Sequence, residues 1–222
     1  MKMLRFIQVL VLVCVLMIPV LIILFLRGFS SNQYDIPILY QNGVDDPFEQ
    51  CDYNDSSQHY IPDFTFTDQF GRSVGKEMMD GKITIVDFFF TSCPSICPIM
   101  SKEMERVQDV FRNNDRVQIY SISIDPEYDS PKVLADYAEE HGAKKDKWFF
   151  LSGPVEETYD LARCGFIIPT VSGGAVPENF VHSDKFVLVD ELGRIRGYYS
   201  GTEREGVDQL ILETKILLHD EE

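Results

Sequence analysis

Apolar and polar positions alternate in two distinct rhythms from Tyr60 to the end of the chain. Short continuous apolar runs bounded by turn residues are typical of buried strands, whereas apolar residues spaced three and four apart indicate amphipathic helices. The predicted strands cover residues 64–67, 82–90, 117–124 and 148–151, and a hairpin covers 186–190 and 195–199. The predicted helices cover residues 99–112, 130–142, 156–162 and 203–219. This order predicts an α/β fold with a mixed central sheet flanked by helices, which is the pattern of the thioredoxin fold.

The N-terminal part of the chain is a continuous apolar run rather than an alternation of apolar and polar positions. Residues 6–26 carry no charge, and about 21 apolar residues match the thickness of a bilayer. No small-residue cleavage site follows, which disfavours a removable signal peptide. Lys2 and Arg5 precede the run and only Arg27 follows it closely, which favours a cytoplasmic N-terminus. We therefore expect a single transmembrane anchor in residues 1–27 of a cell (inner) membrane protein, with the C-terminal domain extracytoplasmic or periplasmic.

Residues 28–59 are polar and lack sustained periodicity, so they are predicted to form an extracytoplasmic linker. Within this linker, the apolar run 37–40 could add an edge strand. The folded domain is then expected to cover residues 60–222. Residues 165–183 contain Gly, Pro and Ser without clear periodicity, which predicts a long functional loop inside that domain.

The charge of the chain limits its partners. A formal net charge of −16 disfavours nucleic acid and anionic lipid, because both require a surplus of Lys and Arg. The acidity is consistent with solubility at a cell surface, and attraction to basic partners is an unspecific alternative.

Two cysteines follow the most apolar predicted strand at once. Cys93 and Cys97 are four residues apart beside Pro94 and Pro98, which suit a helix start. On a helix, residues at this spacing share a face, and the N–H groups at a helix N-terminus favour thiolate over thiol. Two such thiolates can close into a redox disulfide or bind a soft metal ion, and this pattern alone leaves both open.

Three other cysteines are Cys14, Cys51 and Cys164. Cys14 lies within the apolar N-terminal run. Cys51 and Cys164 could form a structural disulfide that ties the linker to the domain, or they could be two separately buried thiols. The sequence does not decide between these alternatives.

Three segments together resemble the Sco/SenC family. Residues 90–98 resemble its CPxxCP signature after an aromatic strand, residues 121–131 resemble its second segment, and residues 181–190 match its histidine-serine pair ahead of a strand. The resemblance runs in order from about Ile61 to Leu218. Ser130 stands where threonine is more usual in the family.

The resemblance implies a membrane-tethered copper chaperone that helps assemble the dinuclear copper centre of a respiratory cytochrome c oxidase. The implied ligands are Cys93, Cys97 and His182, and the implied partners are the copper-centre subunit of the oxidase and a copper donor protein. Two thiolates and one imidazole suit Cu(I) and tolerate Cu(II), whereas structural zinc would need a fourth ligand.

Asp125 and Asp129 end a predicted strand near the cysteines. They are candidates for orienting a ligand or for docking a donor protein, and the alternative is that they stabilise the following helix. Met100 and Met104 have helical spacing and are expected to pack in the core. No role is assigned to His59, His141 or His219.

The competing prediction is an enzyme rather than a metallochaperone. In a thiol-disulfide oxidoreductase, Cys93 would be the nucleophile and Cys97 the resolving thiol. Such an enzyme would not need His182. A thiol peroxidase is less favoured, because Thr91 lies two rather than three residues before Cys93, and a tether without chemistry would leave the two thiols unexplained.

Overall fold

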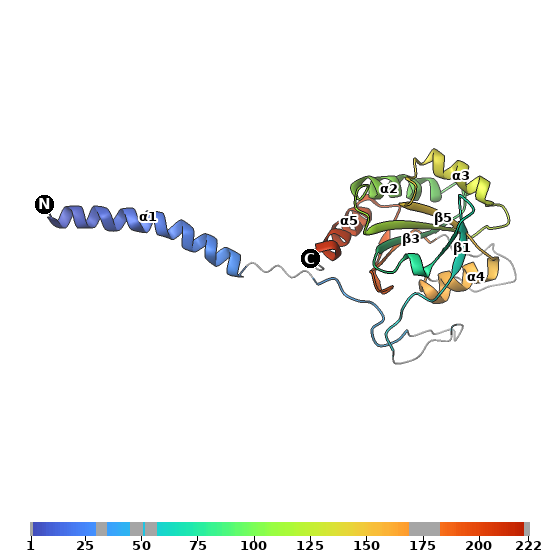
Figure 1. Cartoon of the computed structure of the whole chain (residues 1–222), viewed down its shortest axis with the longest axis horizontal. Coiled ribbons are helices and arrows are strands. Elements are labelled where there is room, and N and C mark those ends of the chain that lie inside the picture. The colour runs from blue at the N-terminus through green and yellow to red at the C-terminus, as the bar shows by residue number, and fades with distance from the viewer. Residues whose placement is uncertain (1, 30–34, 45–50, 52–56, 169–182, 220–222) are drawn as a thin grey trace. The chain divides into compact units, whose positions relative to one another are not determined.

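The computed structural model describes residues 2–29, 35–44, 51, 57–168 and 183–219 (Figure 1). The chain forms two compact units, Met1–Asp35 and Ile36–Glu222.

The first unit contains helix α1, Lys2–Phe29. Its stretch Arg5–Phe25 has 21 residues with a mean hydropathy of 3.2, so it is long and apolar enough to cross a membrane. This agrees with the apolar N-terminal helix predicted from the sequence.

The second unit is built on a seven-stranded sheet with the order β2-β1-β5-β4-β3-β6-β7. The strands are β1 Thr65–Asp68, β2 Ser73–Gly75, β3 Ile83–Phe89, β4 Val117–Ser123, β5 Trp148–Ser152, β6 Lys185–Val189 and β7 Ile195–Ser200. The three central strands β3, β4 and β5 are parallel, and both edges of the sheet are antiparallel hairpins. The mixed sheet is the one that the sequence predicts.

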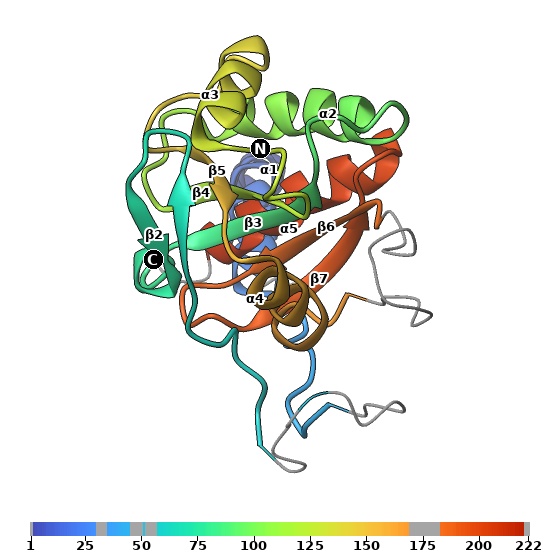
Figure 2. The ribbon, with the colours of Figure 1, turned by 90° about the vertical axis from the view of Figure 1, so that its right-hand side faces the viewer.

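Helices cover both faces of this sheet (Figure 2). They are η1 Lys76–Met78, α2 Cys97–Val110, α3 Pro131–Glu140, α4 Val155–Asp160, the π-turn η2 Leu161–Gly165 and α5 Arg204–His219. Apolar side chains of α2, α3 and α5 form one core cluster with one face of the sheet, and those of η2 pack with the other. All seven positions of β3 and of β4 are buried, as their continuous apolar character predicts.

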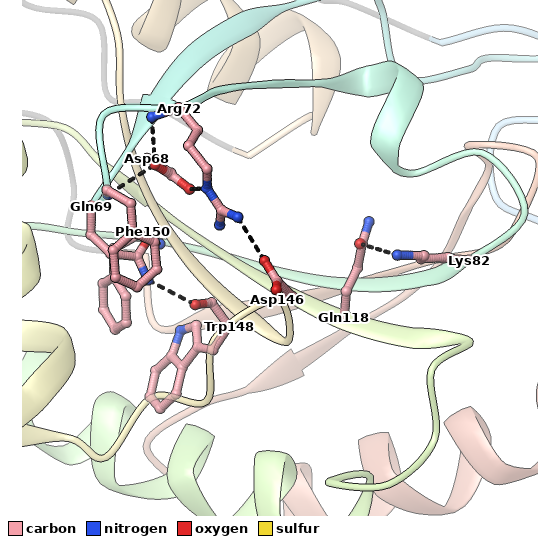
Figure 3. A network of polar contacts seen from close by, with 9 residues as sticks. Asp68, Gln69, Arg72, Lys82, Gln118, Asp146, Trp148 and Phe150 are labelled. Atoms are coloured by element: carbon pink, nitrogen blue, oxygen red, sulfur yellow. Dashed lines mark hydrogen bonds and ion pairs between the residues drawn. The ribbon is translucent and has the colours of Figure 1, made fainter.

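The two edge hairpins close with the same turn, in which Asp is followed by Gly at the fourth position and Arg at the fifth. In the β1–β2 turn, Asp68 accepts hydrogen bonds from the backbone N–H groups of Phe70 and Arg72 at 2.9 and 2.8 Å and from Arg72 Nε at 2.7 Å. Figure 3 shows Arg72 reaching on to Asp146 of the neighbouring loop, 2.7 Å away.

The β6–β7 turn repeats this arrangement with Asp190 as the acceptor of Leu192 N, Arg194 N and Arg194 Nε. The glycines have φ values of +75° at Gly71 and +77° at Gly193, a region that residues with a Cβ rarely adopt.

Part of the predicted linker belongs to the folded unit. Ile36 is 4% exposed, and the Arg196 guanidinium donates hydrogen bonds to the carbonyls of Ile36 and Pro37. The Leu39 N–H donates to Ile195 O of β7 at 2.9 Å, yet residues 37–40 form no strand, contrary to the prediction of an edge strand there. The folded unit therefore begins at Ile36 rather than at Tyr60. The pattern of the sequence could not predict this boundary, because the hydrogen-bond partner of Ile36 lies 160 residues further along the chain.

Strand β2 is a second difference from the sequence prediction. It has three residues and pairs with β1. Such a short run has no detectable periodicity, so the pattern of the sequence carries no signal for it.

Candidate thiol and metal site

Cys93 and Cys97 lie in the connection between β3 and α2. Cys97 is the first residue of α2, and Cys93 lies in the preceding turn, with its N–H donating to Phe90 O at 3.2 Å. The two cysteines therefore do not share a regular helix face. Both are free thiols and both are buried, with exposures of 5% and 3%. They are buried because they join the apolar cluster beneath α2.

The surroundings shift the pKa values of the two thiols in opposite directions. Burial alone would raise the pKa of Cys93, but hydrogen bonds from the Cys97 thiol, from the N–H groups of Ser95 and Cys97 and from the Ser95 hydroxyl outweigh it and lower that pKa. The Ser95 hydroxyl lies 3.7 Å from Cys93 Sγ. Burial and the neighbouring Cys93 raise the pKa of Cys97. One thiol is therefore prepared to ionise, and the other holds its proton.

A buried carboxylate lies on the same face of β3 as the apolar cluster that contains the thiols. Asp87 is 2% exposed and accepts a hydrogen bond from the Ser121 hydroxyl at 2.6 Å, and Ser121 Oγ in turn accepts from Trp148 Nε1 at 2.8 Å. Burial raises the pKa of Asp87 to about 7, against the opposing effect of the Ser121 hydrogen bond. Its charge contributes to raising the pKa of Cys97. A carboxylate inside the apolar run of residues 83–90 was a signal that sequence reasoning missed.

Asp129 is fully buried and connects residues 91–97, the cysteine segment, to the sheet. Its Oδ2 accepts hydrogen bonds from Thr91 N at 3.1 Å and from Ser123 Oγ at 2.5 Å, and its Oδ1 accepts from the Thr91 hydroxyl. The hydroxyl of Ser130, not Asp129, accepts from Val133 N and caps α3. The contacts of Asp129 thus run towards the cysteine segment rather than to the following helix.

Asp125 is half-buried and contributes through its backbone. Its carbonyl accepts hydrogen bonds from Tyr128 N at 3.1 Å and Asp129 N at 2.9 Å, and its own N–H donates to Ser123 Oγ at 3.1 Å. This turn brings Asp129 back over the end of β4. The structure thus gives Asp125 a part in the turn that precedes α3.

The proposed third ligand, His182, lies outside the described residues. Within the part of the chain that the structure describes, no group of three or more His, Cys, Asp and Glu side chains is placed to hold a metal ion. Two residues after His182, Asp184 begins the approach to β6, and its Oδ2 accepts from Ser200 Oγ at 2.7 Å. The ligand role of His182 stays a prediction.

Cys51 and Cys164 are joined by a disulfide with a Cα–Cα distance of 5.6 Å. It connects Cys51, which precedes β1 within the folded unit, to the π-turn η2. Nearby, the ring of His59 forms a hydrogen bond of 2.7 Å with Gly165 O, so the same two segments make a second contact.

The remaining residues singled out in the sequence have structural contacts of their own. Met100 and Met104 are buried in the core, in keeping with their helical spacing. His141 pairs with Glu105 at 2.9 Å, and His219 is the exposed last residue of α5.

Comparison with known proteins agrees with this geometry. The sequence profile of the SCO1/SenC family matches residues 53–216. The SCO1 protein homolog of Bacillus subtilis is 32% identical over 165 residues, which cover 72% of this chain and 84% of that relative.

Two solved structures extend the comparison to the fold. BsSco, described as a member of the Sco family of cytochrome c oxidase assembly proteins with a disulfide switch, is 31% identical, has a TM-score of 0.63, and is matched over 73% of this chain and 95% of its own. Arabidopsis thaliana ScoI, solved with copper bound, is 25% identical, has a TM-score of 0.57, and is matched over 72% of this chain and 98% of its own. The predicted thioredoxin-like fold is confirmed.

Proposed function

Because this chain belongs to the SCO1/SenC family, we propose that it is a membrane-anchored copper-binding protein that assists assembly of the dinuclear copper centre of a respiratory cytochrome c oxidase. In this proposal α1 is a single transmembrane anchor, the residues between α1 and Ile36 are the linker, and the unit from Ile36 onward is the copper-binding domain on the extracytoplasmic side. Copper is the cargo, and its ligands are Cys93, Cys97 and His182.

The observation that carries the proposal is the pair of free, buried thiols at the start of α2. Thiolates are the ligands that Cu(I) prefers, and the apolar cluster around these thiols keeps competing water away from them. Cys93 enters this chemistry with its pKa already lowered. The proton of Cys97 must leave when the metal binds, so loading releases protons and strengthens as pH rises.

The proposed partners are a copper donor protein and the copper-centre subunit of the oxidase. Two relatives support this assignment, since one belongs to a family of cytochrome c oxidase assembly proteins and another was solved with copper bound. The net charge of −16 makes nucleic acid an unfavourable partner.

A thiol-disulfide oxidoreductase is the second candidate. It is favoured by the unequal thiols, because a nucleophile with a lowered pKa beside a protonated neighbour is the arrangement that disulfide exchange uses. In that reaction Cys93 would attack a partner disulfide, and Cys97 would then displace the partner as its thiolate. The protein would end with a Cys93–Cys97 disulfide and the partner with two thiols.

Anaerobic Cu(I) titration of the full-length, reduced protein in detergent separates the two candidates. We expect one tightly bound copper in the wild type and a weakened site in His182→Ala. His219→Ala is the matched control, because His219 is an exposed histidine at a helix end, and it should bind like the wild type. Unchanged copper affinity in His182→Ala would remove His182 from the site and favour the oxidoreductase.

A further inference from the structure

Asp129 is a charged side chain with no exposed surface, and the proposed copper ligands do not include it. A buried carboxylate destabilises a fold unless hydrogen-bond donors occupy its lone pairs. Asp129 has three such donors, two from Thr91 and one from Ser123. They come from Thr91, which follows the last paired residue of β3, and from the last residue of β4, so this carboxylate extends the connection between the two strands beyond the end of their pairing.

We infer that Asp129 is a positioning residue for Cys93, holding the segment from Thr91 to Cys97 against the end of β4 so that the Cys93 sulfur stays among its donors. The inference rests on the proposed function, in which Cys93 is the reactive thiol and a copper ligand.

The cysteine segment is held at two ends. At its far end Cys97 is fixed by α2, and at its near end Thr91 is fixed by Asp129, two residues before Cys93. The groups that hydrogen-bond the Cys93 sulfur, the N–H groups of Ser95 and Cys97 and the Ser95 hydroxyl 3.7 Å away, all belong to this segment. If the near end is released, nothing described in the structure replaces Asp129 as the acceptor for Thr91, and the path of the segment past the sulfur can change.

The carboxylate is suited to this task by geometry rather than by charge. In Asp129→Asn, the amide oxygen can take the place of Oδ2 and accept from Thr91 N and Ser123 Oγ, while the amide NH₂ can donate to the Thr91 hydroxyl. In Asp129→Ala, two partly buried donors of Thr91 and the buried hydroxyl of Ser123 lose their acceptor. Thr91→Val keeps the backbone N–H and removes only the hydroxyl contact.

Asp190 provides a matched control at the other end of the sheet. It is 2% exposed and, like Asp129, accepts several hydrogen bonds, among them those of Leu192 N and Arg194 N. It follows β6 where that strand pairs with the beginning of β3, whereas the cysteines follow the end of β3. Asp190→Ala should therefore destabilise the fold without reaching the thiols.

The test is the rate constant for alkylation of Cys93 by iodoacetamide in the full-length, metal-free protein in detergent, read by peptide mass spectrometry after mild reduction. We expect Asp129→Ala to slow the reaction about three- to tenfold, because a sulfur displaced from these hydrogen-bond donors is less often a thiolate, which outweighs the greater nucleophilicity of each thiolate that remains. Asp129→Asn should stay within about twofold of the wild type, and Thr91→Val should fall between them. Asp190→Ala should leave the rate within about twofold, even where its unfolding midpoint drops as far as that of Asp129→Ala.

An unchanged or faster Cys93 rate in Asp129→Ala, or an equal slowing in Asp190→Ala, would overturn the inference. If Asp129→Ala does not fold, Thr91→Val decides, since an unchanged rate there has the same meaning. Cu(I) affinity, measured by competition with a chromophoric chelator, is a separate arm. A wild type that binds no copper would defeat the proposed function while leaving the alkylation series to test Asp129.

Discussion

Cys51 and Cys164 are joined by a disulfide across 113 residues of sequence, whereas Cys93 and Cys97, only four residues apart, are both free. The bridge joins two segments that are also linked by the hydrogen bond between the His59 ring and Gly165 O. The free pair lies inside the core at a helix start, where N–H groups and a hydroxyl stabilise the thiolate of Cys93. Stabilising the thiolate favours the reduced state over the disulfide. Nearness in the chain therefore does not decide which cysteines form a bridge, and the surroundings of each sulfur do.

The largest expected difference between the pairs concerns copper. Replacing Cys93 or Cys97 with Ser should lower Cu(I) affinity by roughly three orders of magnitude or more, because a soft thiolate ligand becomes a hard hydroxyl. The double variant Cys51→Ser with Cys164→Ser should keep one copper per chain. Chelator competition measures both, and loss of copper from the double variant would show that the two pairs are not separate in function.

The free energy of unfolding should depend more on the Cys51–Cys164 pair than on the Cys93–Cys97 pair, which is the reverse of the expectation for copper. Losing the Cys51–Cys164 bridge frees a long loop in the unfolded chain, so the double variant should lose about 2–5 kcal/mol of unfolding free energy. Replacing Cys93 and Cys97 with Ala should cost about 1 kcal/mol, since it removes buried sulfur atoms and no covalent link. Chemical denaturation without reductant makes the comparison, and equal losses in the two variants would contradict it.

The buried Asp87 lies on the face of β3 that packs with the cluster of the free thiols, and it should make the free energy of unfolding depend on pH. Its pKa is about 7 in the folded protein and 3.8 ordinarily, so the folded state holds the proton more tightly than the unfolded chain does. Between about pH 4 and pH 7 unfolding therefore releases a proton, and stability falls as pH rises, on the order of 2–4 kcal/mol in all.

Asp87→Asn mimics the protonated side chain and should remove this part of the pH dependence. Denaturation of both proteins at pH 5 and pH 8 measures it. If the difference between the two pH values is the same in the variant and the wild type, Asp87 is not the group responsible.

The smallest expected effect is selectivity within the free pair. Near neutral pH, iodoacetamide should modify Cys93 at least about tenfold faster than Cys97, because the pKa of Cys93 is lowered and that of Cys97 is raised. The alkylation rate of Cys93 should reach half its maximum below pH 9.0, its ordinary pKa, and that of Cys97 above it. Peptide mass spectrometry over a pH series would detect the reverse order, which would contradict the assignment of Cys93 as the nucleophile.

Much of the fold could be predicted because its central signals are local. The apolar run that becomes β3 and the helical spacing of Met100 and Met104 predict buried elements without reference to the rest of the chain. The proximity of Cys93 and Cys97 to a strand end likewise follows from their position in the sequence. These features depend on neighbours within one or two turns of the chain.

The parts that could not be predicted depend on distant partners. Thr91 and Ser123 are ordinary polar residues in the sequence, and only their contact with Asp129 gives them meaning. The burial of both thiols likewise depends on packing beneath α2, which no local pattern encodes. His182 belongs to neither group. The family resemblance implies that it is a ligand, and it lies outside the described residues.

The contact between residues 36–39 and β7 has a practical consequence for handling the protein. β7 is the last strand of the sheet, and Leu39 satisfies one of its outward carbonyls while Arg196 is held by the carbonyls of Ile36 and Pro37. A truncated protein that begins at Tyr60 would leave the outer edge of β7 uncovered. An uncovered edge strand can pair with other chains and cause aggregation. Shortened forms of the protein should therefore keep every residue from Ile36 onward if they are to remain monodisperse.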